Sequence, residues 1–168
     1  TLAPSRDVGV TEGQQCARLV VPRGAGWAEF QLGPSARRGW AKMQIVALDL
    51  YADQESPAAS MALELWDLDS KDYASRFTSE APVRPGRQTL TWRVDRARRN
   101  RRGAMDWEEL TPADKIDLGR LVCVKIITGR NGERDQQFWI DNLRLLQEQD
   151  LYPSMNIALP SGAVGFDL

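Results

Sequence analysis

Short stretches in which apolar and polar residues alternate recur along the chain. Such period-two alternation indicates β-strands, because successive side chains of a strand point to opposite faces of the sheet. Eight stretches are predicted as strands: 16–21, 27–32, 43–51, 62–67, 75–81, 87–94, 121–128 and 136–145. Glycine, proline and aspartate mark turns between many of them. About eight strands at this spacing predict an all-β fold, a two-sheet antiparallel sandwich of the jelly-roll kind.

The alternation also assigns side chains to faces. In residues 62–67, Leu63 and Leu65 fall on the core side, so Glu64 and Trp66 are expected on the opposite face. An indole that points away from the core needs a partner, either a ligand or a segment that covers it.

Two of the later strands lead to further expectations. The inward positions of residues 121–128 are expected to be Val122, Val124 and Ile126. In residues 136–145 the alternation of apolar positions shifts by one residue midway. A β-bulge at residues 141–142 would restore one continuous apolar face.

One stretch, residues 105–119, departs from the strand pattern. Thr111 followed by Pro112 is typical of the start of a helix, so one short helical insertion is predicted to cover one end of the sandwich. The domain is expected to span residues 8–146. Residues 147–168 are turn-rich and are interpreted as a linker or tail.

Charge and hydropathy exclude several classes of function. Twenty-two basic and twenty-three acidic residues nearly cancel, which argues against nucleic acid as a partner. No apolar run approaches the roughly 20 residues that a membrane-spanning helix needs, so membrane insertion is not expected. The arginine-rich residues 96–102 are interpreted as a solvated loop or, alternatively, as an edge that binds an anionic glycan or a partner protein.

The residues available for catalysis are few. The sequence contains no histidine, which removes Ser-His-Asp and Cys-His catalysis and the usual zinc sites. Carboxylates are numerous, but no pair stands out as a glycosidase acid and base. We therefore expect no catalytic residues and no enzyme activity in the isolated domain. The two cysteines, Cys16 and Cys123, are interpreted as buried thiols or as a single disulfide bridge.

Several segments resemble galactose-binding-like β-sandwich domains, among them many carbohydrate-binding modules. Residues 138–145, Phe-Trp-Ile-Asp-Asn-Leu-Arg-Leu, resemble the closing strand of that family. Residues 10–14 and 47–51 resemble its opening turn and central strand. Residues 70–77 resemble a segment of the modules attached to agarase-like and galactosidase-like glycoside hydrolases.

This resemblance implies a non-catalytic module that targets a larger protein to a polysaccharide or oligosaccharide. The location is then expected to be extracellular, periplasmic or at the cell surface. Residues 161–168 look like the entry to a following module, so adjoining modules of the same polypeptide are expected partners; an ordinary C-terminal tail is the alternative. The alternative function is a structural or protein-interaction spacer domain that binds no sugar.

Two groups of residues are candidates for sugar binding. Trp66 is expected at the centre of an outer ligand face, with Glu64 beside it and with Tyr51 and Asp49 within reach if their strand lies nearby. The alternative is that the insertion or the tail covers Trp66. The second group lies in the segment that carries the resemblance and comprises Asp69, Asp72, Tyr73 and Arg76.

A structural calcium ion is predicted where the first and last strands meet. Calcium prefers oxygen ligands, and the Glu12 turn beside a bulged Asp141 could supply them. The alternative is that Glu12 is solvated and that Asp141 only accepts hydrogen bonds from backbone groups at the bulge.

Overall fold

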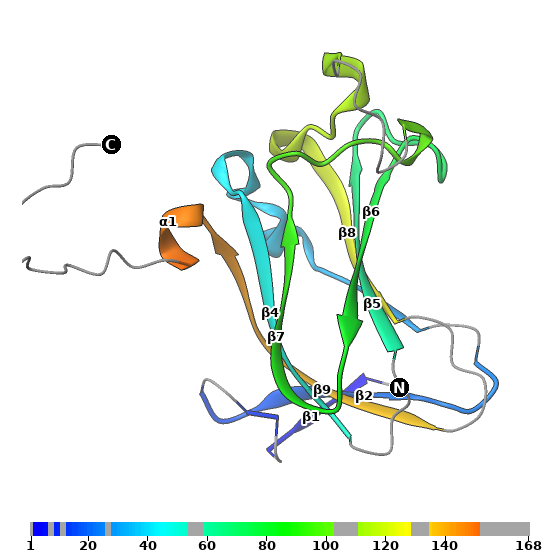
Figure 1. Ribbon diagram of the computed structural model, residues 1–168, viewed down its shortest axis with the longest axis vertical. Coiled ribbons are helices and arrows are strands. Elements are labelled where there is room, and N and C mark those ends of the chain that lie inside the picture. Colours follow the sequence, from blue (N-terminus) through cyan, green and yellow to red (C-terminus); the bar gives the residue numbers. More distant parts are fainter. Residues whose placement is uncertain are drawn as a thin grey trace, which may run out of the picture.

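Two antiparallel β-sheets pack face to face in the computed structural model, which describes residues 2–6, 9–10, 13–25, 28–53, 59–102, 111–128 and 135–151 (Figure 1). One sheet has five strands in the order β1-β2-β9-β4-β7, and the other has four in the order β3-β8-β5-β6. The strands are β1 (Leu2–Ser5), β2 (Cys16–Val21), β3 (Glu29–Gln31), β4 (Ile45–Ala52), β5 (Ala59–Asp67), β6 (Phe77–Val83), β7 (Gly86–Arg93), β8 (Leu121–Thr128) and β9 (Gln136–Leu146). The predicted two-sheet sandwich is confirmed.

Strand β1 is the one strand of the described residues that the alternation did not predict. It is four residues long and contains Pro4, which lacks the N–H group that an interior strand must donate. Its position at the edge of the five-stranded sheet, paired with β2 alone, makes the proline acceptable.

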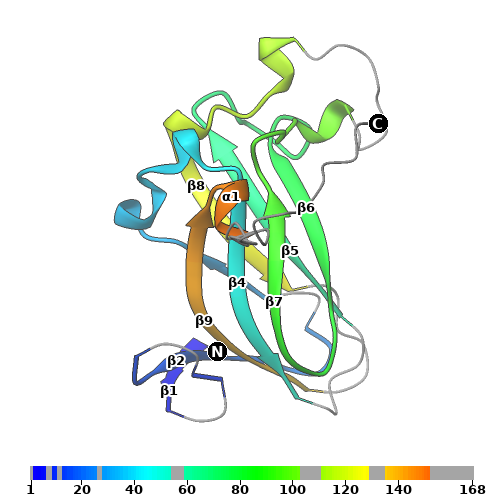
Figure 2. The same cartoon turned by 60° about the vertical axis from the view of Figure 1, so that its left-hand side comes forward.

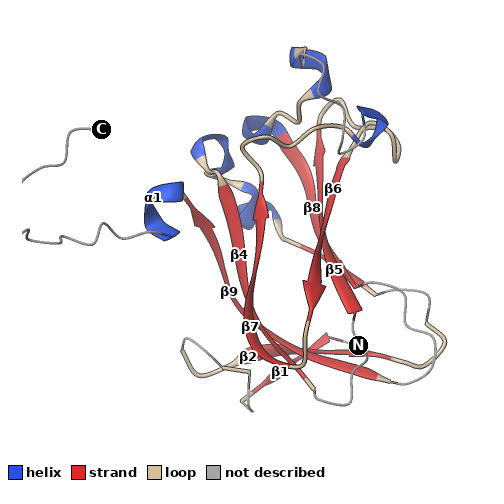
Figure 3. Ribbon diagram, in the orientation of Figure 1, coloured by secondary structure: helices blue, strands red, loops and turns tan. Residues whose placement is uncertain are grey.

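The helical elements are short. They are the 3-10 helices η1 (Pro34–Arg37), η2 (Trp40–Lys42), η3 (Asn100–Arg102), η4 (Pro112–Asp114) and η5 (Leu118–Arg120), and the α-helix α1 (Glu148–Leu151). Figure 3 shows them towards the end of the sandwich opposite the β6–β7 turn. The predicted helical start after Thr111 corresponds to η4, which a capping box closes. None of the described helices is long and apolar enough to cross a membrane.

The core lies between the two sheets. Leu63 and Leu65 of β5 are fully buried, as the alternation predicted, and they pack with apolar residues from the inner faces of both sheets. Val124 and Ile126 are also buried as expected, but Val122 is 37% exposed. The ladder between β5 and β8 shifts register between Trp66 and Asp67, so Val122 becomes the additional residue and leaves the core face.

The bulge predicted in the last strand is confirmed. The register between β4 and β9 shifts after the pair Asp49–Asp141, and Asn142 takes up the extra residue with φ 48°. Asparagine tolerates this left-handed conformation better than most residues. Residues on both sides of the bulge then pack against one core. Figure 2 shows the curved path of β9, which pairs with β2 near its start and with β4 further along.

Candidate functional site

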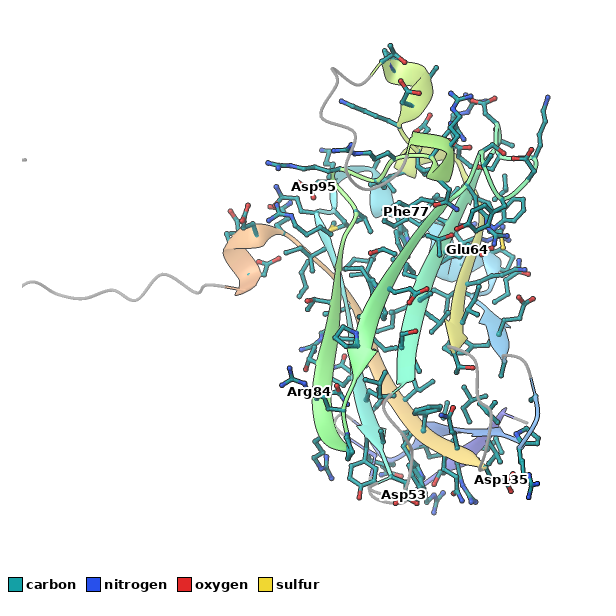
Figure 4. The ribbon with its side chains drawn as sticks, turned by 45° about the vertical axis from the view of Figure 1, so that its right-hand side comes forward. Asp53, Glu64, Phe77, Arg84, Asp95 and Asp135 are labelled. Atoms are coloured by element: carbon teal, nitrogen blue, oxygen red, sulfur yellow. The ribbon has the colours of Figure 1, made fainter. Side chains whose placement is uncertain are left out.

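The outer face of the four-stranded sheet carries the densest cluster of the candidate residues. Strand β5 is an interior strand, and its alternation places Glu64 and Trp66 on this outer face. Strand β6 pairs with β5 so that Phe77 lies opposite Leu65. Arg76, which directly precedes β6, is thereby brought beside Trp66. In Figure 4 Glu64 lies towards the end of the sandwich that also holds Asp95, whereas Asp53 and Asp135 lie at the other end.

Arg76 is in contact with two aromatic rings. The carbon at the centre of its guanidinium lies 5.1 Å from the ring centroid of Trp66 and 4.9 Å from that of Tyr73. These distances are typical of cation–π contacts, which contribute about 0.5–1 kcal/mol at exposed sites and more where water is excluded. Trp66 and Arg76 are half-buried, whereas Tyr73 is 64% exposed. Tyr73 is therefore the ring of this cluster that is most open to a ligand.

Glu64 contacts both Trp66 and Arg76 and fixes their positions. Its side chain is only 1% exposed, its Oε1 accepts a hydrogen bond from the indole Nε1 of Trp66, and its Oε2 lies 2.9 Å from Nη2 of Arg76. A buried carboxylate needs such partners, because the loss of hydration is costly. The Oε2 contact is an ion pair without good hydrogen-bond geometry, and this oxygen is shielded from solvent, so Arg76 supplies its counter-charge.

A groove of about 460 Å³ runs along this face beside the cluster. It is lined by Glu29, Ser60, Ala62, Glu64, Tyr73, Arg76, Thr78, Glu80, Ile127 and Thr128. Lys125, on the neighbouring strand β8, lies 3.0 Å from Glu29, and this hydrogen bond raises the pKa of the lysine. The groove thus combines an exposed aromatic ring with polar side chains that are fixed by their own partners.

The loop that carries Tyr73 is fastened at its base by Asp67 and Arg99. The guanidinium contacts the carboxylate with both Nη atoms, at 2.9 and 3.2 Å, and its Nε donates to the backbone oxygen of Ala113 at 2.9 Å. Asp67 also accepts hydrogen bonds from the Ser70 hydroxyl and from the backbone N–H of Asp117. Burial acts to raise the pKa of Asp67, but these hydrogen bonds outweigh it and lower the pKa below its usual value of 3.8.

This ion pair corrects part of the interpretation of residues 96–102. Arg99 is buried at 6% exposure, so this arginine is a structural residue and does not belong to a solvated loop or an anion-binding edge. Arg96, by contrast, is exposed. The sequence pattern could not separate the two arginines, because Asp67, the partner of Arg99, lies 32 positions earlier in the chain.

Asp69 and Asp72, which were expected to bind sugar, lie in the same loop as Tyr73, and the structure shows their contacts within that loop. Asp72 accepts hydrogen bonds from the hydroxyl and backbone N–H of Ser75, at 2.7 and 2.9 Å, and these bonds lower the pKa of Asp72. It closes the turn that presents Tyr73. Asp69 is exposed, and its backbone N–H donates to Asp67.

Asp49 and Tyr51 are not brought to the Trp66 face. They lie on β4, which belongs to the five-stranded sheet, so the two outer faces that carry these candidates point in opposite directions. The expected single cluster of Trp66, Glu64, Tyr51 and Asp49 is thus divided between two sheets. Its first two members instead join Tyr73 and Arg76.

The residues on β4 form a separate polar cluster. The Asp49 carboxylate accepts hydrogen bonds from Arg144 Nη2 at 2.6 Å and from the Thr89 hydroxyl at 2.7 Å. Tyr51 packs edge-on against Trp139 with ring centroids 5.4 Å apart. Asp49 and Tyr51 therefore both have partners on the outer face of the five-stranded sheet.

Of the two predicted calcium ligands, the structure describes Asp141 only. Glu12 lies outside the described residues. Asp141 is half-buried, and its Oδ1 accepts a hydrogen bond from the backbone N–H of Asn142 at 2.8 Å, as the alternative expected. Among the described residues no group of three or more acidic or cysteine side chains is arranged to hold a metal ion. The calcium site therefore stays a prediction.

The two cysteines are both free thiols in the structure. Cys16 lies on β2 and Cys123 on β8, in different sheets, and burial raises the pKa of the Cys123 thiol. A disulfide bridge between them is not formed.

No protein family and no curated protein matches the sequence, whereas solved structures do match the fold. A family 11 carbohydrate-binding module from Clostridium thermocellum, in complex with a β-1,3-1,4-mixed-linked tetrasaccharide, is similar with a TM-score of 0.56 and 11% identity over 88% of this chain and 83% of that chain. A family 30 module of a cellulosomal cellulase of Clostridium thermocellum is similar with a TM-score of 0.56 and 15% identity over the same shares. The chain therefore shares the β-sandwich fold of these carbohydrate-binding modules.

Proposed function

We propose that this chain is a non-catalytic carbohydrate-binding module that holds a larger extracellular, periplasmic or cell-surface protein against a polysaccharide. The observation that carries the proposal is the exposed ring of Tyr73, which lies at the groove beside the fixed charges of Arg76 and Glu64. The likeness to modules whose function is carbohydrate binding supports it, including one in complex with a tetrasaccharide.

The chemistry of the groove suits a sugar ring. A pyranose presents an apolar C–H face, which would stack on Tyr73, and hydroxyl groups around its rim. Arg76 would donate hydrogen bonds to those hydroxyls, while the buried carboxylate of Glu64 keeps its guanidinium in place. In this proposal Trp66 supports Arg76 from inside and is not itself the stacking surface.

A second candidate function is a protein-interaction domain. Leu68 is 57% exposed and lies in the same loop as Tyr73, and exposed apolar side chains gathered in one loop are also typical of protein interfaces. The adjoining modules of a larger polypeptide, reached through residues 147–168, would be such partners. The calcium ion between Glu12 and Asp141 is a further proposal, and it would serve stability without taking part in binding.

Affinity electrophoresis of the full chain through gels that contain a panel of polysaccharides tests the proposed function. We expect retention by at least one polymer and a loss of about tenfold in affinity for Tyr73→Ala, since stacking contributes about 1.4 kcal/mol. Leu68→Ala is the matched control in the same loop and should leave retention unchanged. If no polymer retards the parent chain, or if Tyr73→Ala is retained equally, the proposed sugar site is wrong.

A further inference from the structure

A second groove, of about 350 Å³, also has Tyr73 in its lining. Its lining comprises Tyr73, Phe77, Thr78, Ser79, Arg96, Arg98, Arg99 and Asn100. Tyr73 and Thr78 line the first groove as well, so the two grooves are neighbours that meet at the tyrosine. A glycan chain stacked on Tyr73 would extend into both.

The two grooves differ in charge. Three glutamates and one arginine line the first, whereas the lining of the second contains three arginines and no carboxylate. Arg99 is neutralised by its ion pair with Asp67. Arg96 has a side chain that is 82% exposed, and its Nε lies 4.0 Å from Asp95, at the outer limit of an ion pair. The guanidinium of Arg96 is therefore open to an anion from solution.

The position of the arginines relative to Tyr73 is fixed by hydrogen bonds between the two loops. Asn100 Nδ2 donates to the backbone oxygen of Tyr73 at 2.9 Å, and Asn100 Oδ1 accepts from the backbone N–H of Thr78 at 3.0 Å. The backbone N–H groups of Asn100 and Arg101 donate to the oxygens of Arg76 and Ala74. The basic groove is thus part of the same rigid unit as the stacking ring.

We propose that the site continues past Tyr73 into this basic groove and that its ligand is an acidic polysaccharide. Guanidinium groups bind carboxylate and sulfate groups with paired hydrogen bonds, which favours an acidic substituent beside Arg96. In the first groove Glu64 and Glu29 are paired with Arg76 and Lys125. The exposed carboxylate of Glu80 is therefore the group that disfavours an anion there, and the sugar in that groove is expected to be uncharged. The ligand would therefore carry its acidic groups on one side of Tyr73 only. This inference rests on the proposed function.

Pairs of polymers that differ only in charge test this inference. Agarose and chemically sulfated agarose form one pair, and methyl-esterified and de-esterified homogalacturonan form another. We expect the full chain to bind the acidic member of at least one pair about tenfold more tightly than the neutral member, as one charge-assisted hydrogen bond allows. The double variant Arg96→Gln, Arg98→Gln should lose that preference and keep its affinity for the neutral member.

The control is the double variant Arg23→Gln, Arg84→Gln, which removes two exposed arginines that lie outside both grooves. It should keep the preference for the acidic member. Equal binding of both members of each pair, or an equal loss in the control, overturns the acidic ligand but not the sugar site, provided that Tyr73→Ala weakens binding. Acidic binding that survives Tyr73→Ala overturns both proposals, because the basic groove then acts without the stacking ring.

Discussion

The carboxylate of Asp67 and the guanidinium of Arg99 form a bidentate ion pair that is almost completely buried, with its shorter contact at 2.9 Å. The pair joins the end of β5 to the loop that carries the arginines, and Arg99 also donates to the backbone oxygen of Ser75. This one ion pair therefore stabilises the positions of both loops of the proposed site.

Removing one partner of this pair should destabilise the domain strongly. Asp67→Ala leaves a buried arginine without its counter-charge, and we expect the free energy of unfolding to fall by about 3–5 kcal/mol. Urea denaturation measures the change. Asp69→Ala removes an exposed carboxylate two residues away and should stay within about 0.5 kcal/mol of the parent. Similar losses in both variants would contradict the role of the pair.

The same carboxylate predicts a dependence of stability on pH. The pKa of Asp67 in the folded state lies below its usual value of 3.8, so its contribution is complete above that value and is lost as the pH falls through the lowered pKa. Asp67→Asn should therefore flatten the fall in unfolding free energy below pH 3.8. Denaturation curves collected at several pH values measure this change. If the unfolding free energy of Asp67→Asn falls at acid pH as steeply as that of the parent, Asp67 does not cause the fall.

Trp66 and Tyr73 should respond differently to conservative substitution. Trp66→Phe keeps a ring beneath Arg76 and removes the hydrogen bond to Glu64, which costs about 1 kcal/mol. We expect it to lower the melting temperature and to change polysaccharide affinity by less than about fivefold. Tyr73→Phe should keep most of the affinity, because the stacking face is retained. A complete loss of binding in Trp66→Phe with an unchanged melting temperature would make the indole the stacking surface.

The calcium proposal predicts that a chelator lowers the melting temperature of the parent chain and that added calcium restores it. Asp141→Asn should remove this response, because a carbonyl oxygen binds the ion more weakly than a carboxylate. Differential scanning calorimetry and elemental analysis provide the measurements. A melting temperature insensitive to chelator, together with protein free of calcium, would count against the site.

The sequence predicted most of the strands because their faces alternate, and it identified Glu64 and Trp66 on an outer face for the same reason. It did not predict which strands share a sheet. Consecutive strands are usually neighbours, yet β4 and β5 lie in different sheets, so Asp49 and Tyr51 were grouped with the wrong face. The sequence could have predicted that Trp66 and Arg76 lie close together, since these residues stand at the joined ends of two consecutive, antiparallel strands.

The alternation of apolar and polar residues could not predict contacts between loops that are distant in the sequence. Asp67 stands at the end of β5, and Arg99 reaches it through the path of a distant loop, which no local periodicity specifies. Val122 was misplaced for a related reason, because one inserted residue reverses the phase of a strand.

The alternation at the end of β5 also has a mechanical consequence. Trp66 points outward and supports Arg76, whereas the adjacent Asp67 points inward and anchors the loop through Arg99. Tyr73 lies in the loop between β5 and β6, so a polymer that pulls on it would load both strands, of which only β6 lies at the edge of the sheet. The load would then be shared by the two ladders that β5 forms with β6 and with β8.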